Sequence, residues 1–130
     1  MDAISIQPGP ELGPLSGPGR EEREFDAARF DALHRQTGKL IVICDHQVSF
    51  HDLAFPVTLW HQFPTQAEAA DRYEQFLKDV LSRPYMIGYF HCQYWNQWMP
   101  APRNLLKQGL RQADGKPYEE LITRRREIHQ

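Results

Sequence analysis

The chain has 130 residues, of which 41% are hydrophobic, and a formal net charge of −2 at pH 7. This length and apolar content suit the core of one soluble globular domain spanning residues 1–130. The 15 basic residues nearly balance the 17 acidic ones, and no apolar stretch reaches the ~20 residues that a membrane span needs, so we expect no nucleic-acid partner and no membrane partner. The start of the sequence has no signal-peptide pattern, so the sequence gives no indication of export, and the localisation is left open.

The first half of the chain predicts a strand, a helix and a second strand. Asp2–Ile6 has a short strand pattern, and a loop rich in glycine and proline follows it through Arg20. A helix is predicted from about Asp26 to Gln36, with Asp26 as its N-cap and Gly38 as its C-terminal cap. The apolar run Leu40–Cys44 is typical of a parallel strand that is covered on both faces.

The second half repeats the alternation. Thr65–Glu68 is a capping box, and the helix after it has an apolar face formed by Ala69, Tyr73, Phe76, Leu77, Val80 and Leu81. Met86–Phe90 is predicted as the third strand. Lys116 and Pro117 are predicted to begin a last helix, whose stripe consists of Leu121, Ile122, Arg125 and Ile128. Alternation of this kind predicts an α/β fold with parallel strands and right-handed crossovers.

Residues 84–118 are unusually rich in rings and amides directly after the third strand. Aromatic rings stack on the flat C–H faces of sugars, while asparagine and glutamine form hydrogen bonds with sugar hydroxyls. This segment therefore predicts a carbohydrate-binding loop. The alternative is that the rings fill a core, as single buried aromatic residues usually do.

The cysteines and histidines indicate no cofactor and no metal. Cys44 and Cys92 are predicted to be buried thiols, since a chain with this apolar content folds without a disulfide framework. Cys44, Asp45 and four histidines could lie near the strand ends, but they have no recognised ligand spacing: His46, His51, His61 and His91. A metal-dependent hydrolase remains a minor alternative.

Four short motifs, taken in order, resemble the end of a retaining glycoside hydrolase barrel of the β-agarase and β-galactosidase type: Gly38–Asp45, Arg83–Tyr89, Gln108–Leu110 and Asp114–Tyr118. The resemblance covers roughly residues 2–128. It implies three C-terminal strand–helix units of a partial (β/α) barrel, with parallel strands and helices outside. A complete barrel typically needs about 250 residues.

The resemblance also implies site residues. Asp45 falls at the position of the family's nucleophilic glutamate, although aspartate is shorter by one methylene, or about 1.5 Å. His91 stands where the family usually has a tryptophan. The implied carbohydrate groove is lined by Gln7, Glu11, His46, His91, Gln93, Tyr94, Trp95, Asn96 and Trp98.

Retaining hydrolysis needs a second carboxyl group about 5 to 5.5 Å from the nucleophile. Glu11, Asp52 and Asp114 lie on loops, and none follows a strand end as Asp45 does. We therefore expect a fragment of a glycoside hydrolase that is inactive by itself. The alternative is a non-catalytic α/β module that binds carbohydrate or associates with itself through exposed sheet edges.

Overall fold

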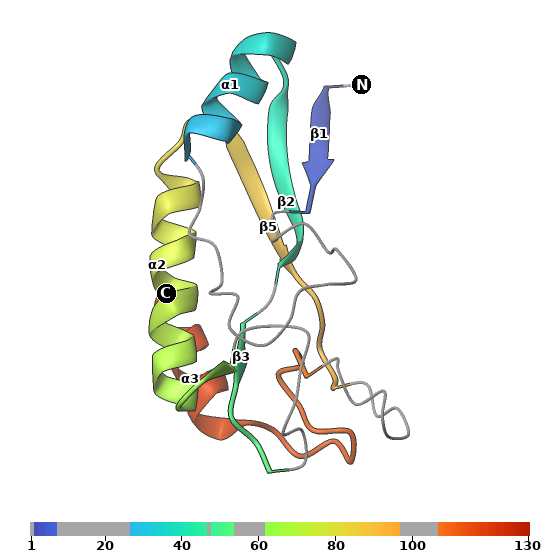
Figure 1. Cartoon of the computed structure of the whole chain (residues 1–130), viewed down its shortest axis with the longest axis vertical. Coiled ribbons are helices and arrows are strands. Elements are labelled where there is room, and N and C mark those ends of the chain that lie inside the picture. The colour runs from blue at the N-terminus through green and yellow to red at the C-terminus, as the bar shows by residue number, and fades with distance from the viewer. Residues whose placement is uncertain (1, 8–26, 47, 54–61, 97–106) are drawn as a thin grey trace.

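The computed structural model describes residues 2–7, 27–46, 48–53, 62–96 and 107–130. Its larger sheet has three parallel strands in the order β1 (Ala3–Ile6), β2 (Leu40–His46) and β5 (Met86–His91). A smaller parallel sheet pairs β3 (Ser49–Phe50) with β4 (Gln62–Phe63). The three helices are α1 (Ala27–Thr37), α2 (Gln66–Leu81) and α3 (Glu119–Ile128), as Figure 1 shows. The predicted α/β class with parallel strands is confirmed.

Local sequence signals fix the ends of α1 and α2. Gly38 has a φ of +64° and its N–H donates to the carbonyl of His34 at 2.8 Å, which confirms the predicted glycine cap of α1. Thr65 is the N-cap of α2, and its hydroxyl oxygen accepts the N–H of Glu68 at 3.1 Å. The predicted N-cap Asp26 lies outside the described residues.

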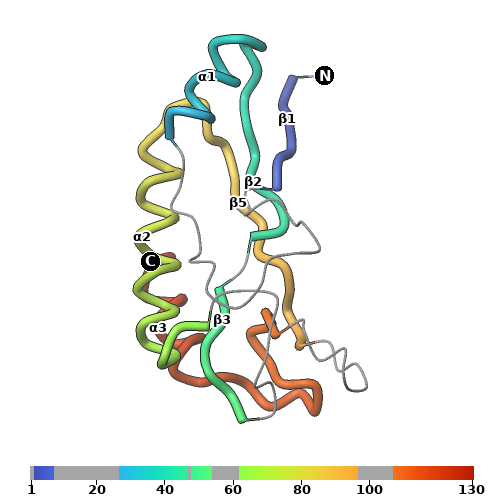
Figure 2. The backbone as a smooth tube through the Cα atoms, in the orientation of Figure 1, coloured from blue at the N-terminus to red at the C-terminus, as the bar shows by residue number. Residues whose placement is uncertain are grey.

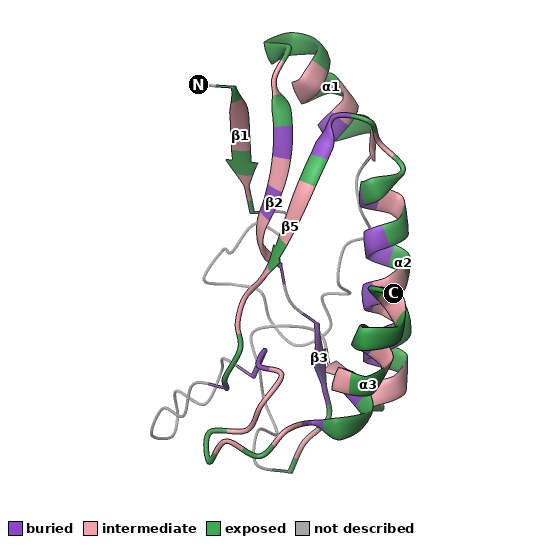
Figure 3. Ribbon diagram, turned by 180° about the vertical axis from the view of Figure 1, so that it is seen from behind, coloured by how far each residue is buried: buried purple, intermediate pink, exposed green. Residues whose placement is uncertain are grey.

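The core lies between the larger sheet and the helices. Ile41 and Ile43 of β2 are fully buried against Phe30 of α1 and against Phe76 and Val80 of α2. A second cluster joins α2 and α3 to β3; its buried members are Val48, Phe50, Ala69, Ala70, Tyr73, Leu77, Tyr118 and Leu121. Helix α1 and helix α2 therefore cover the same face of the sheet, and Figure 3 shows that the buried residues of α2 face the strands.

The opposite face of the sheet has no helix on it within the described part of the chain. Tyr89 packs toward α2, so its neighbour Phe90 points the other way, because side chains alternate along a strand. Phe90 is accordingly 65% exposed. No described helix is long and apolar enough to cross a membrane.

Three local predictions were wrong, and one small sheet was not predicted. Leu81, predicted on the buried face of α2, is 58% exposed, whereas its neighbour Val80 is fully buried against the strands. The last helix begins at Glu119, because Pro117 instead pairs with Arg111 in an antiparallel bridge. Cys44 and Cys92 are only partly buried. The strands β3 and β4, of two residues each, were not predicted at all.

Candidate functional site

Gln7 and Asp45 meet where β1 and β2 end. Residues 3–6 of β1 pair in parallel with residues 40–43 of β2, so both strands end at the same edge of the sheet. There Gln7 Nε2 donates a hydrogen bond to Asp45 Oδ2 at 2.6 Å. The Gln7 amide at the end of β1 thus orients the Asp45 carboxylate at the end of β2 through its Oδ2 atom. The other carboxylate oxygen of Asp45, Oδ1, is not part of this hydrogen bond.

His46 lies on the other side of the sheet from the one expected for a groove residue. Asp45 has a φ of +57°, a left-handed backbone conformation, and the pairing of β2 with β5 shifts between Ile43 and His46. The shift ends the alternation of side chains, and His46 turns into the core. Its ring stacks on Phe76 with centroids 3.8 Å apart, and its Nδ1 lies 2.7 Å from the Tyr89 hydroxyl.

Cys92, which follows β5, is a second neighbour of Asp45 besides Gln7. Its N–H donates to the carbonyl of His46 at 3.1 Å, which holds it beside the end of β2. Burial, together with a hydrogen bond to the charged Asp45 carboxylate, raises the pKa of the Cys92 thiol to about 11. Gln108 Nε2 donates to Cys92 Sγ at 3.2 Å. The neutral thiol of Cys92 therefore contacts both Asp45 and Gln108, which lies in the segment 107–118.

Two segments after β5 lie side by side, residues 94–96 and 107–118, as Figure 2 shows. These two segments are called the closing loop. The Asn96 N–H donates to the carbonyl of Arg111 at 2.8 Å, and the N–H groups of Leu110 and Arg111 both donate to the carbonyl of Tyr94 at 3.0 Å. Gly109 sits so close to the backbone of Trp95 and Asn96 that a Cβ atom there would overlap it. Close approach of two backbones explains the glycine.

Asn96 is buried at the centre of the closing loop. Its Oδ1 accepts the N–H of Gly109 at 2.7 Å, and its Nδ2 donates to the Tyr118 hydroxyl at 2.7 Å. That hydroxyl in turn donates to Asp52 Oδ2 at 2.8 Å. The structure thus places the predicted groove residue Asn96 inside the loop, where it connects Gly109 to Tyr118 at the start of α3 and, through Tyr118, to Asp52.

Lys107 and Gln108 are site residues that the sequence analysis missed. The Lys107 side chain is 1% exposed; its Nζ lies 2.9 Å from the centre of the Phe50 ring and donates to the Phe50 carbonyl at 2.8 Å. Burial lowers the pKa of Lys107 to about 7, although the negative charge of Asp52 partly opposes this. In the sequence, Lys107 is indistinguishable from an ordinary surface lysine.

His91 and Tyr94 line a cavity of about 480 Å³ between β5, the closing loop and α3. His91 Nε2 lies 2.9 Å from the carbonyl of Gln108. Burial, and to a smaller extent the positive charge of Arg125, lower the pKa of His91 to about 3, so its imidazole is neutral at pH 7. A neutral imidazole can donate only one ring N–H, which fits the single carbonyl at Nε2.

The remaining predicted groove residues are dispersed. Trp95 is 47% exposed and its ring packs edge-on against Tyr94 with centroids 5.8 Å apart. Gln93 is half-buried. Glu11 and Trp98 lie outside the described residues. The structure therefore brings Gln7, Asp45 and Cys92 together at the strand ends, while His91 and Tyr94 line the cavity beside α3.

The other loop acids have structural partners. Asp52 accepts the Tyr118 hydroxyl, and Asp114 Oδ1 accepts the N–H of Lys116 at 2.9 Å in a local turn. Within the described residues, no three side chains of histidine, cysteine, aspartate or glutamate gather closely enough to hold a metal ion. Chemically, the strand ends present one oriented carboxylate, a neighbouring amide and a neutral thiol.

No protein-family model matches the sequence, and no curated protein matches it either. Solved structures do match. An exo-β-agarase superposes on 98% of this chain with a TM-score of 0.72 and 19% identity, and an agarase superposes on 98% with a TM-score of 0.74 and 14% identity. A β-glucuronidase of Bifidobacterium dentium covers 99% of the chain with a TM-score of 0.62 and 16% identity.

The chain spans only 16%, 18% and 21% of the lengths of these three proteins. At such identities the likeness is one of fold. The structural neighbours are glycoside hydrolases, and the chain has the fold of one segment of them.

Proposed function

We propose that residues 1–130 are the C-terminal part of a glycoside hydrolase-like (β/α) barrel, folded as one domain of three strand–helix units. One observation carries the proposal: in the described part of the chain, the three parallel strands have helices on one face only. In addition, 98% of the chain superposes on an exo-β-agarase, of which it covers 16%. In a barrel the uncovered face of such a sheet is directed inward and is filled by side chains from the other strands. The exposed Phe90 has the orientation that this arrangement requires.

In this proposal Asp45 is the nucleophile-position carboxylate. It lies at the C-terminal end of a parallel strand, which is where barrel enzymes carry their catalytic groups. Gln7 fixes one of its oxygens, and attack would come from the other. The acid that protonates the leaving group would come from a strand outside these residues, so the chain alone does not hydrolyse glycosides.

The carbohydrate groove in this proposal is formed by the loops after the strands, and its substrate class is β-linked oligosaccharides or polysaccharides. Among the described residues after β5, Tyr94 and Trp95 have exposed rings, and exposed rings are the surfaces on which sugars stack. Asn96 and Lys107 contribute indirectly, since they fix the backbone that carries these rings. The predicted groove residues His46 and Asn96 act here as supports rather than as contacts.

Binding of agarose-derived and other β-linked oligosaccharides tests the groove. Isothermal titration should show saturable binding to the chain, and Trp95→Ala should weaken it about tenfold, which corresponds to the stacking contribution of one ring. Leu81→Ala is the matched control, because Leu81 is comparably exposed but lies at the far end of α2. Equal affinity of Trp95→Ala and wild type, or no binding to any saccharide, would refute the groove.

The coding sequence before Met1 tests the barrel. The proposal expects five further strand–helix units upstream, with an acidic residue at the end of the fourth strand to serve as acid/base. An upstream sequence without strand–helix alternation would refute the partial barrel and leave the carbohydrate groove to be judged by binding alone.

A second candidate function is a self-associating α/β module. It is favoured by the two sheet edges: neither β1 nor β5 has a strand on its outer side within the described part of the chain. Ile87 and Phe90 of β5 are also exposed. Light scattering coupled to gel filtration distinguishes the cases: a dimer that Phe90→Lys dissociates supports self-association, and a monomer that binds sugar supports the first proposal.

A further inference from the structure

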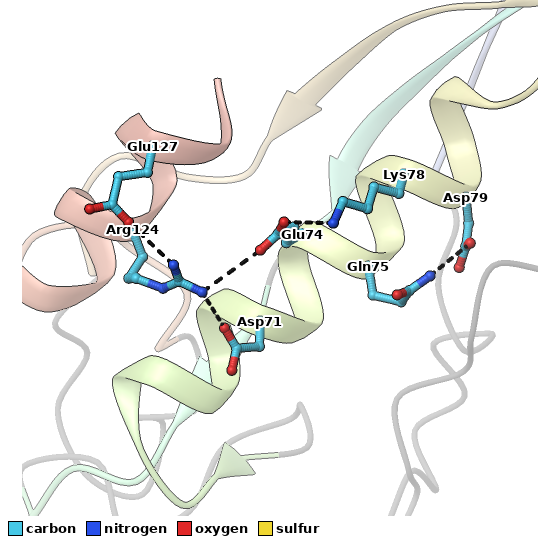
Figure 4. Close-up of polar contacts among 7 residues, drawn as sticks. All are labelled: Asp71, Glu74, Gln75, Lys78, Asp79, Arg124 and Glu127. Carbon is cyan, nitrogen blue, oxygen red and sulfur yellow. Dashed lines mark hydrogen bonds and ion pairs between the residues drawn. The ribbon is translucent and has the colours of Figure 1, made fainter. Parts of the chain in front are cut away.

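Three consecutive arginines of α3, Arg124, Arg125 and Arg126, have different neighbours. Arg124 is surrounded by carboxylates: its Nη2 lies 2.6 Å from Asp71 and 3.7 Å from Glu74, and its Nη1 lies 3.2 Å from Glu127. Figure 4 shows this cluster on the side of α3 that faces α2. Arg124 is therefore fully compensated by acids from its own helix and the adjacent one.

Arg125 and Arg126 instead line the cavity of about 480 Å³ beside β5. The Arg125 side chain is buried, and its guanidinium carbon lies 3.8 Å from the centre of the Tyr73 ring. Arg126 is exposed at the rim. A third guanidinium comes from Arg111, which donates through Nε to the Tyr94 hydroxyl at 2.8 Å.

Among the described residues, the walls of the cavity carry more positive than negative charge. Among the described residues that line it, none is acidic; besides the three arginines they are Tyr73, Tyr89, His91, Tyr94, Leu110, Ile122 and His129. The Tyr73 hydroxyl is engaged with His129 Nε2 at 2.8 Å. Burial and the charge of Arg125 both keep His91 neutral by lowering its pKa. Three guanidiniums, with no carboxylate among the described wall residues, concentrate positive charge in a partly desolvated space.

We propose that this cavity is a binding site for a small oxyanion, that is, a carboxylate, sulfate or phosphate group held by Arg111, Arg125 and Arg126. Guanidinium groups donate in a planar fork that matches two oxygens of such an anion, and charge-assisted hydrogen bonds of this kind are about twice as strong as neutral ones. The volume lies within the range of small-molecule pockets. The site is on the helix-covered side of the sheet, separate from Asp45, and it does not depend on the proposed glycosidase role.

Inorganic sulfate is the probe for this site. It is titrated into the 130-residue chain against sodium chloride at constant ionic strength, and the Nε–Hε signals of the arginines are followed by ¹⁵N-edited NMR. Saturable sulfate-specific shifts of Arg125 and Arg126, with Arg124 unmoved, are expected. Equal shifts with chloride and sulfate, or shifts of all three arginines together, would overturn the proposal.

Two matched variants sharpen the experiment, because Arg126→Gln and Arg124→Gln remove the same charge from adjacent positions of one helix. Arg126→Gln should weaken sulfate binding about tenfold, the loss that corresponds to one charge-assisted contact. Arg124→Gln should leave the sulfate affinity within about twofold of wild type. An equal loss in both variants would mean that net charge, not the cavity, attracts the anion, and would refute the site.

Discussion

Gln7 Nε2 and Asp45 Oδ2 are 2.6 Å apart although the residues are separated by 38 positions in the sequence. The contact exists because β1 and β2 pair in parallel, so Gln7, which follows β1, and Asp45, near the end of β2, reach the same end of the sheet. It joins the first described strand to the one acid that the sequence singles out. It also leaves one carboxylate oxygen directed away from the amide.

Removal of this contact should have a small and measurable effect on stability. A double-mutant cycle with Gln7→Ala and Asp45→Ala should give a coupling free energy of about 0.5 to 1 kcal/mol in urea unfolding, since the pair is exposed to solvent. Gln75 and Asp79, an exposed pair one turn apart on α2, provide the control cycle, with an expected coupling of about 0.3 kcal/mol. Additivity of the Gln7 and Asp45 changes within about 0.3 kcal/mol would contradict the hydrogen bond.

Asn96→Ala should destabilise the protein by about 2 to 3 kcal/mol. The change leaves the buried N–H of Gly109 and the Tyr118 hydroxyl without their amide partner, and each lost buried hydrogen bond costs on the order of 1 to 3 kcal/mol. The free energy of unfolding in urea measures it. Gln75→Ala, which removes an exposed amide, should change that free energy by less than about 0.5 kcal/mol. A loss of the same small size for Asn96→Ala would disprove its role in the closing loop.

Stability should rise with pH between pH 7 and pH 9 because of Lys107. Its pKa is lowered from 10.5 to about 7 in the folded chain, so in this window the unfolded chain binds a proton that the folded chain has released. The free energy of unfolding should increase by about 2 kcal/mol across the window. Above pH 9 the rise should level off, because the folded state raises the pKa of Cys92 from 9.0 to about 11 and retains a proton that the unfolded state loses, which offsets the continuing gain from Lys107.

Lys107→Met tests the origin of this rise. The variant keeps an unbranched side chain against Phe50 and Tyr118 but cannot titrate, so its stability should be flat from pH 7 to pH 9. Urea unfolding at pH 7, 8 and 9 supplies the comparison. If the variant retained the full rise, another group would have to be its source.

Gly109→Ala should destabilise the closing loop by about 3 kcal/mol, because a Cβ atom would overlap the backbone of Trp95 and Asn96, and a backbone cannot swing aside as a flexible side chain can. Gly38→Ala is the graded control: space is open around Gly38, and only its φ of +64° opposes a side chain, at a cost of about 1 kcal/mol. Thermal unfolding of the two variants ranks them. A Gly109→Ala variant no less stable than Gly38→Ala would be inconsistent with the close approach.

Local signals predicted the elements whose ends depend on neighbouring residues. The capping box Thr65–Glu68 and the apolar spacing after it predicted α2, and Gly38 predicted the end of α1, because caps and helical faces involve residues within one or two turns. The apolar runs Leu40–Cys44 and Met86–Phe90 likewise predicted parallel strands. The start of α3 was predicted three residues too early, since a bridge from Pro117 to Arg111 competes with the helix.

The sequence by itself determined the alternation of strands and helices, the parallel sheet and the placement of Asp45 at a strand end. Only the tertiary structure decided which way the side chains around Asp45 turn. The left-handed backbone conformation of Asp45 turns His46 into the core. The close pairing of residues 94–96 with residues 107–118 buries Asn96 and Lys107. The position of α3 beside α2 places Arg124 next to Asp71 and Arg125 next to the Tyr73 ring. These outcomes depend on contacts between residues far apart in the chain, which no local propensity encodes.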